Sequence, residues 1–268
     1  MKVSGLIANY NGGKKVVKSV KLCLEYCDEV IFVDDKSNDG SYEKVKKIKN
    51  EKLKIFRNKI NSGASYSRNI CAKKASFQNL LFVDNDCYFD KKNFKKILGF
   101  KEDIIYPRII DTTQNIYNHI PGRYLQNSVC FFISKKNFKK VKGFDEKIRI
   151  YMDDVDFFFR CWKMGLKIKY IEDSKGFHDS KKSKETISNN FFKNLENTVY
   201  FCLKHKRFGI SKEEFPNTLT ILANLRRSIL NKDRLYGMEL SEKKINSFLK
   251  AIKSIVNGAR YYLKTRNQ

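Results

Sequence analysis

Four apolar residues run directly into two carboxylates at positions 80–86, which read LLFVDND. The apolar run predicts a buried strand, so the carboxylates lie at its carboxyl end, where open α/β sheets bind their ligands. Asp84 and Asp86 suit a hard cation, because Mg²⁺ in enzymes is held by one or two carboxylates together with substrate phosphates. The alternative is an ordinary turn, since Asp and Asn favour turns at strand ends.

A chain of 268 residues can bury a self-sufficient core, as one large domain or one domain with a small appendage. Its seven cysteines are odd in number and form no CxxC pair, so a disulfide framework or zinc site is not expected. We interpret them as reduced core residues of a cytosolic protein.

The charge is strongly basic, with 55 Lys and Arg against 29 Asp and Glu and a net charge of +26. This charge favours anionic partners, although a biased genome composition would also explain it. The first residues predict a strand, so no signal peptide is expected, and no apolar run is long enough to span a membrane. We expect a cytoplasmic protein, with the basic surface resting on the inner face of the cell membrane as a further hypothesis.

Strands and helices alternate at short intervals over roughly the first ninety residues. Strands are predicted at 2–10, 29–33, 53–57 and 80–83, with helices at 16–27, 42–49 and 64–75 between them. This order predicts an α/β fold with a Rossmann-like, mostly parallel sheet flanked by helices.

The alternation breaks after Asp86. Irregular or edge strands are predicted at 104–120, because Pro107 and Pro121 interrupt the β-branched residues. A strand at 129–134, a helix that opens with residues 151–156 and reaches Met164, and a strand at 167–172 follow. We predict one domain over 1–180, and a basic, helical region over 181–268 that begins with a polar linker.

Further motifs occur in a fixed order before and after Asp84 and Asp86. They are IANYNG at 7–12, VDDKSNDGS at 33–41, NSG at 61–63 followed by Arg68 and Asn69, and GFDE at 143–146 followed by DDVD at 153–156. In order and spacing they resemble the family 2 glycosyltransferases of GT-A fold, over roughly residues 2 to 180. The resemblance implies a bacterial surface-glycan enzyme, rhamnosyltransferase-like or related, that uses a nucleotide-sugar donor and Mn²⁺ or Mg²⁺.

The donor side can be argued from side-chain chemistry. Asp35 or its neighbour Asp34 could accept hydrogen bonds from a base imide or a ribose hydroxyl, and Tyr10 offers an aromatic surface for the base. Asp86 is the predicted direct metal ligand, with Asp84 acting through water or through donor hydroxyls. The predicted nucleotide-sugar-binding residues are Ala8, Tyr10, Asp34, Asp35, Asn61, Gly63, Arg68, Asp84 and Asn85.

The acceptor hydroxyl needs a base, and the resemblance places the acidic pair Asp153 and Asp154 at that position. Asp154 matches the Asp that is usually the base in an inverting displacement. Asp153 stands where Glu is usual, so the division of labour between the two stays open. The alternative is a charge cluster that favours the helix start.

Two aromatic side chains, His178 and Trp162, are less specific indicators of function. His178 is a candidate third metal ligand, because neutral imidazole binds Mn²⁺, although a lone His is also common as a surface or core residue. Trp162 lies near the position of a motif of processive synthases but departs from that motif. We therefore expect one sugar to be added per encounter, with Trp162 in the core or on the acceptor side.

The expected acceptor is a glycan or a lipid-linked glycan. The basic residues of the last helical region would rest on an anionic membrane surface, or they form a solvated face. They include Lys204, His205, Lys206, Arg207, Arg226 and Arg227. Two alternatives stay open. One is a nucleic-acid-binding protein or a metal-dependent nuclease or nucleotidyltransferase, which the absence of a recognition motif disfavours; the other is a degenerate transferase that serves as a scaffold.

Overall fold

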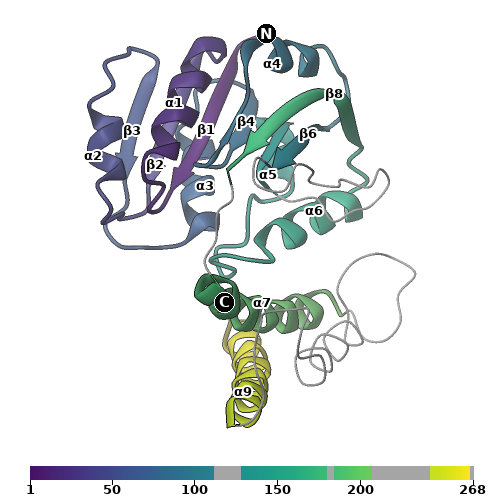
Figure 1. The fold of residues 1–268 in the computed structure, drawn as a ribbon. Coiled ribbons are helices and arrows are strands. Elements are labelled where there is room, and N and C mark those ends of the chain that lie inside the picture. The colour runs from purple at the N-terminus through teal and green to yellow at the C-terminus, as the bar shows by residue number, and fades with distance from the viewer. Residues whose placement is uncertain (112–127, 180–183, 207–241, 266–268) are drawn as a thin grey trace. The chain divides into compact units, whose positions relative to one another are not determined.

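The computed structural model describes residues 1–111, 128–179, 184–206 and 242–265 (Figure 1). The chain divides into two compact units, Met1–Ser180 and Lys181–Gln268. Of the predicted basic surface, Arg207, Arg226 and Arg227 lie outside the described residues, as does most of the predicted polar linker.

The first unit is built on an eight-stranded mixed sheet in the order β3-β2-β1-β4-β7-β6-β8-β5. The strands are β1 (Val3–Asn9), β2 (Glu29–Asp34), β3 (Leu53–Arg57), β4 (Asn79–Val83), β5 (Cys87–Tyr88), β6 (Ile104–Asp111), β7 (Cys130–Ser134) and β8 (Ile168–His178). The predicted strands of the first ninety residues are therefore present, and the short strand β5 was not predicted.

Strands β1 to β4 run parallel, so their carboxyl ends meet at one edge of the sheet. The chain moves outward from β1 to β2 and β3, then returns to place β4 on the other side of β1. This reversal between β1 and β4 is the topological switch point at which α/β sheets bind ligands. It brings the residues after β1, β2 and β4 together at that edge.

The helices in the described part of this unit are α1 (Lys15–Tyr26), α2 (Ser41–Lys46), α3 (Ala64–Lys74), α4 (Lys91–Ile97), α5 (Lys135–Lys140) and α6 (Asp153–Lys163). In α1 the apolar residues recur at helical spacing, and Val16, Val20 and Leu24 are buried. Right-handed crossovers place α1 and α2 on one face of the sheet and α3 on the other. Figure 1 shows α1 across the front of β1 and β2.

Irregular or edge strands were predicted at 104–120; in the described residues 104–111 the strand is irregular, but it is not at an edge. β6 is an eight-residue strand inside the sheet, between β7 and β8. Pro107 is accommodated because β6 pairs with β7 only at Ile104 and Ile105, so the missing amide hydrogen is not needed beyond them. The register with β8 also shifts between Pro107 and Arg108. Pro121 lies outside the described residues.

A cluster of aromatic rings fixes α5 and α6 against β4 and β7. Phe82 stacks on Phe131 with ring centroids 4.7 Å apart, and Phe144 stacks on Phe157 at 4.5 Å. All four rings are buried, which holds the segment between α5 and α6 firmly on the sheet. The seven cysteines are free and buried, as predicted.

The second unit pairs α7 (Lys184–His205) with α9 (Glu242–Thr265). Leu195 and Val199 in α7 are buried, whereas Ile252 in α9 is 40% exposed. α9 packs closely against α7 at Gly258, where an added Cβ would clash with the Glu196 carbonyl oxygen. Among the described residues, no helix is both long enough and apolar enough to cross a membrane.

Candidate active site

The acidic pair follows β4 directly, and three neighbouring elements hold its backbone. The Asp84 amide donates to Val129 O at 2.8 Å, and the Asp179 amide donates to Asp86 O at 2.9 Å. From α1, the Ser19 hydroxyl donates to Asn85 O at 3.2 Å. These bonds fix a turn that presents both carboxylates at the carboxyl edge of the sheet.

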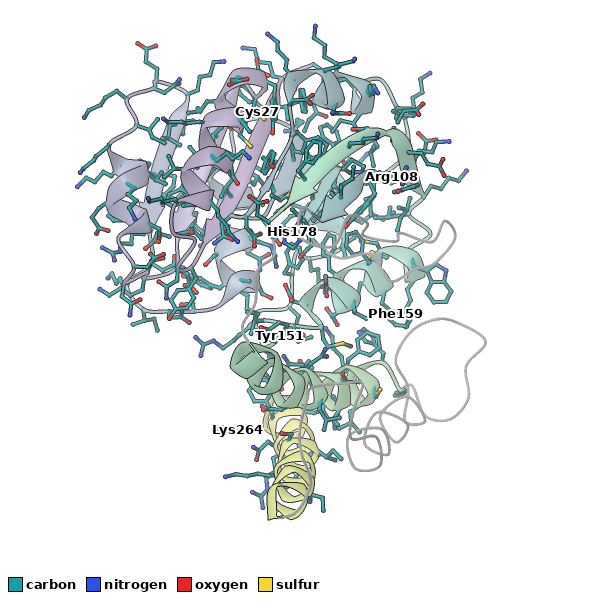
Figure 2. The ribbon with its side chains drawn as sticks, in the orientation of Figure 1. Cys27, Arg108, Tyr151, Phe159, His178 and Lys264 are labelled. Carbon is teal, nitrogen blue, oxygen red and sulfur yellow. The ribbon has the colours of Figure 1, made fainter. Side chains whose placement is uncertain are left out.

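Asp86 and His178 lie side by side, with Oδ1 and Nε2 3.1 Å apart. His178 was predicted just after the last strand, but it is the final residue of β8 and pairs with Cys87. Figure 2 shows His178 toward the end of the sheet opposite to Cys27. The structure therefore brings these two candidate ligands together, and their role as metal ligands stays a prediction.

Asp84 is engaged differently from Asp86. Arg68 donates from Nη2 to Asp84 Oδ1 at 2.7 Å and from Nη1 to Asp153 Oδ2 at 2.6 Å. Burial disfavours the charge on Arg68, but Asp84 and Asp153 outweigh it and raise the pKa of the guanidinium. Burial raises the pKa of Asp84 even though Arg68 opposes the shift. Arg68 thus joins the end of β4 to the start of α6.

The two residues before α6 have a strained backbone, and the first turn of α6 carries Asp153 and Asp154. Tyr151 and Met152 both adopt left-handed conformations, with φ of 59° and 66°. Such conformations cost about 1–3 kcal/mol each and concentrate at functional sites. The strain sets the direction in which Asp153 and Asp154 enter the site.

The carboxyl group of Asp154 is only partly buried, and its Oδ1 accepts a hydrogen bond from the Val155 amide at 2.8 Å. Burial, followed by the charge of Asp153, raises the pKa of Asp154 to about 7. Asp156, by contrast, is fully buried and pairs with Arg160 at 2.8 Å, one turn along the helix. The helix-start interpretation therefore fits Asp156, whereas Asp154 is poised to exchange a proton near neutral pH.

The two carboxylates after β2 are buried and hold loops. Asp34 accepts from Asn9 Nδ2 at 2.9 Å and lies 3.1 Å from Arg57 Nε. Asp35 accepts from the amides of Ser62 at 2.8 Å and Gly63 at 2.7 Å. Asp35 therefore shapes the predicted donor loop at 61–63.

That loop is docked on the segment that precedes α6. Gly63 has φ of 99°, and an added Cβ would lie 2.6 Å from Arg149 O. Arg149 Nη2 bonds Asn61 Oδ1 at 2.7 Å, and the Ala64 amide donates to Arg149 O at 2.7 Å. Sequence reasoning missed Arg149, because a lone arginine in a loop carries no motif.

Of the remaining predicted residues, some lie at the carboxyl edge of the sheet and Trp162 lies away from it. Tyr10 follows β1 at the site edge and is 50% exposed, and Asn85 bonds Asn9 Oδ1 at 2.9 Å. Ala8 is the penultimate residue of β1. Trp162 lies in the last turn of α6, about 13 Å along the axis from Asp153 at 1.5 Å per residue. The structure does not bring Trp162 to this edge, and its acceptor-side role stays a prediction.

Asp86 and His178 are the candidate metal ligands. Within the part of the chain that the structure describes, no third acidic, His or Cys side chain completes a metal-binding group with them. One carboxylate and one imidazole, with substrate phosphates as the other ligands, fit the chemistry of Mn²⁺ or Mg²⁺. Asp84 would have to leave Arg68 to bind a cation directly.

The family model described as glycosyl transferase family 2 matches residues 4–161, more than half of the chain. The chain belongs to this family, as its sequence motifs predict. This assignment disfavours the alternative of a nucleic-acid-binding protein.

Two curated relatives match over shorter segments. The poly(ribitol-phosphate) beta-N-acetylglucosaminyltransferase TarS of Staphylococcus aureus is 31% identical over 110 residues, which cover 38% of this chain and 19% of TarS. The UDP-Glc:alpha-D-GlcNAc-diphosphoundecaprenol beta-1,3-glucosyltransferase WfaP of Escherichia coli is 29% identical over 103 residues, 37% of this chain and 41% of WfaP. The match therefore spans less than half the length of either relative.

Solved structures resemble the whole chain. TarS residues 1–349 in complex with UDP-GlcNAc superpose with a TM-score of 0.62 and 17% identity, over 96% of this chain and 81% of that one. The mannosyltransferase PcManGT of Pyrobaculum calidifontis, in complex with GDP-Man and Mn²⁺, gives a TM-score of 0.60 and 13% identity, over 97% and 75%. The predicted GT-A fold is confirmed.

Proposed function

We propose that this chain transfers one sugar from a nucleotide-sugar donor to a hydroxyl of a glycan or lipid-linked acceptor, with inversion, in bacterial surface-glycan synthesis. The observation that carries the proposal is the position of Arg68 between Asp84 and Asp153, with Asp154 beside them at a pKa of about 7. The family assignment supports it.

The donor nucleotide binds at the switch point between β1 and β4. Tyr10 is exposed enough to stack on a base. Asp35 is the better of the two acidic candidates, because Asp34 is paired with Arg57, whereas Asp35 accepts hydrogen bonds from amide groups. TarS is solved with UDP-GlcNAc, and WfaP is named for UDP-Glc, so we favour a UDP-sugar as the donor.

Asp86 and His178 would hold Mn²⁺ or Mg²⁺. A bound cation would neutralise the charge that builds on the departing diphosphate. Asp84 stays on Arg68 and acts through water or through donor hydroxyls. The protein's own contribution on this side is to place one carboxylate and one imidazole, 3.1 Å apart, at the strand ends.

Asp154 is the base, and Asp153 is a positioning residue. Asp153 is held by Arg68 and is 5% exposed, whereas Asp154 is partly exposed and titrates near neutral pH. The acceptor oxygen attacks the anomeric carbon as its proton passes to Asp154. The bond from the sugar to the diphosphate breaks on the opposite face, and its electrons leave with the nucleoside diphosphate.

The acceptor and the location follow from relatives and charge. The name of WfaP includes a diphosphoundecaprenol acceptor, and the chain carries a net charge of +26. We propose a cytoplasmic enzyme whose helical region, 181–268, rests on the inner face of the cell membrane. Co-sedimentation with liposomes should increase with the fraction of anionic lipid, and unchanged co-sedimentation would contradict this part.

A screen of nucleotide sugars with Mn²⁺ tests the donor proposal. A ligand at about 100 times its Kd adds about 2.7 kcal/mol to stability, so the correct donor should raise the melting temperature clearly. Asp86→Asn should lose most of the Mn²⁺-dependent part of this shift while it keeps the fold. No shift with any nucleotide sugar would argue against the proposal.

A further inference from the structure

A cavity of about 360 Å³ lies between α3 and α5, apart from the site at the strand ends. Its lining residues are Asn69, Ala72, Lys73, Lys135, Phe138, Lys139, Lys142 and Gly143. Four of the eight are lysines, and they come from two different helices and the turn after α5. The cavity is large enough for one sugar or polyol unit.

Among the described residues, no carboxylate forms an ion pair with the lysines of this cavity. Lys135 donates to the Ala75 carbonyl oxygen. Lys73, Lys139 and Lys142 are exposed, and no ion pair to a carboxylate among the described residues involves them. Lys135 and Lys139 are also four positions apart on one helix, where like charges repel. An anion in the cavity would relieve this repulsion.

The floor of the cavity is apolar. Ala72 and Phe138 are buried, and the Phe138 ring packs against Phe82 at a centroid distance of 5.2 Å. An aromatic ring under a group of ammonium ions suits a ligand with both carbon–hydrogen faces and a negative charge. A free inorganic ion would use only the lysines.

Two lining residues, Asn69 and Gly143, connect the cavity to segments of the candidate active site. Asn69 bonds the backbone of Phe144, through Nδ2 to its oxygen at 2.9 Å and through Oδ1 to its amide at 2.9 Å. The next residue, Arg68, lies 5.4 Å from the centre of the Phe144 ring and binds Asp153. Gly143 also lines the cavity, and it precedes Asp153 and Asp154 in the sequence by about ten residues.

We propose that this lysine cavity, defined by Lys73, Lys135, Lys139 and Lys142, binds a phosphate or carboxylate group of an anionic acceptor glycan. A unit held there would tether the polymer while another unit presents its hydroxyl to Asp154. The assignment to the acceptor rests on the proposed function, whereas the binding of an anionic glycan does not.

The experiment compares Lys73→Ala/Lys139→Ala with the control Lys44→Ala/Lys47→Ala. Both double variants remove two exposed positive charges, and the control pair lies on or next to α2, far along the sheet order from the cavity. Binding is measured without donor, at low salt, to a polyol-phosphate oligomer, an oligogalacturonate, a neutral maltooligosaccharide and a single-stranded oligonucleotide.

The cavity variant should bind the polyol-phosphate or the uronate oligomer about tenfold more weakly, which corresponds to about 1.4 kcal/mol, while the control stays near wild type. The oligomer that binds more tightly identifies the acidic group. Equal weakening in both variants, or tighter cavity-dependent binding of the oligonucleotide, would overturn the proposal.

Donor binding is measured on the same variants as a separate readout. UDP should stabilise both double variants as it does the wild type, because the lysines are not donor residues. If oligomer binding depends on the cavity but no nucleotide sugar is bound or turned over, the cavity stands and the proposed function fails.

Discussion

Arg68 donates from Nη1 to Oδ2 of Asp153 at 2.6 Å, across 85 positions of the sequence. The same guanidinium also holds Asp84, so one side chain connects the end of β4 to the helix that carries the proposed base, Asp154. Arg68 thus contributes, with the aromatic cluster and the Asn69 bonds to Phe144, to the relative position of the two halves of the site.

Replacing Arg68 with Ala should destabilise the protein. The change leaves Asp84 and Asp153 without their partner, and breaking a buried pair in this way costs about 3–5 kcal/mol. Chemical denaturation at pH 7 measures the loss. The loss should shrink at pH 5, where more of the two carboxyl groups are protonated, and a loss independent of pH would contradict the pairing.

The activity should rise with pH through a value near 7. Burial and Asp153 raise the pKa of Asp154 to about 7, and the base works only when it is deprotonated. In Asp153→Asn the rising limb of kcat/KM should move to lower pH, because the negative neighbour is gone. An unmoved limb would show that another group controls it.

Asp154→Asn should stabilise the fold while it removes transfer. The folded-state pKa of Asp154 lies above its ordinary value of 3.8, so its contribution to stability is fully present below that value and is lost as pH rises through about 7. At pH 8 the variant should gain about 1 kcal/mol, or about 2–4 °C in melting temperature. At pH 4 the gain should vanish, and a pH-independent gain would contradict this origin.

Gly63→Ala should cost more stability than Gly40→Ala. Both glycines have positive φ, at 99° and 75°, so both substitutions carry backbone strain of about 1–3 kcal/mol. Only at Gly63 does the new Cβ meet another atom, Arg149 O at 2.6 Å, while nothing lies within 4 Å at Gly40. Thermal unfolding of the two variants, with UDP affinity as a second readout, compares them; equal costs would refute the docking of this loop.

Asp86→Asn should weaken Mn²⁺ binding in the presence of UDP by at least about tenfold, or about 1.4 kcal/mol. Asp84→Asn should weaken it by a much smaller factor, because Asp84 is paired with Arg68 and Asp86 lies beside His178. Titration of free Mn²⁺ by electron paramagnetic resonance gives both constants. The reverse order would assign the metal to Asp84.

Local patterns in the sequence were enough to predict the parallel half of the fold. The apolar run before Asp84 and the loops after β1 and β2 carry signals of short range, so the switch-point edge could be foreseen. β6 could not, because whether a strand containing Pro107 lies inside a sheet depends on which neighbour bonds to it at that residue.

The same limit applies to the site. The motifs named Arg68, Asp84 and Asp153 separately, but only the packing of α3 and α6 on the sheet shows that one guanidinium binds both carboxylates. Arg149 holds the predicted donor loop through its guanidinium, which bonds Asn61 and Ser62, and through its carbonyl oxygen. A lone arginine in a loop carries no motif, so the sequence did not point to it. Trp162 was chosen because it is a tryptophan near a motif position, yet it lies at the opposite end of α6 from Asp153 and Asp154.

The most direct test is the release of nucleoside diphosphate from a panel of nucleotide sugars with Mn²⁺ and an acceptor glycan, for the wild type and Asp154→Asn. The wild type should release diphosphate from one donor, and the variant should be slower by about 10²–10⁴-fold while it binds UDP normally. Equal release by the two proteins, or none by the wild type with any donor, would contradict a glycosyltransferase whose base is Asp154.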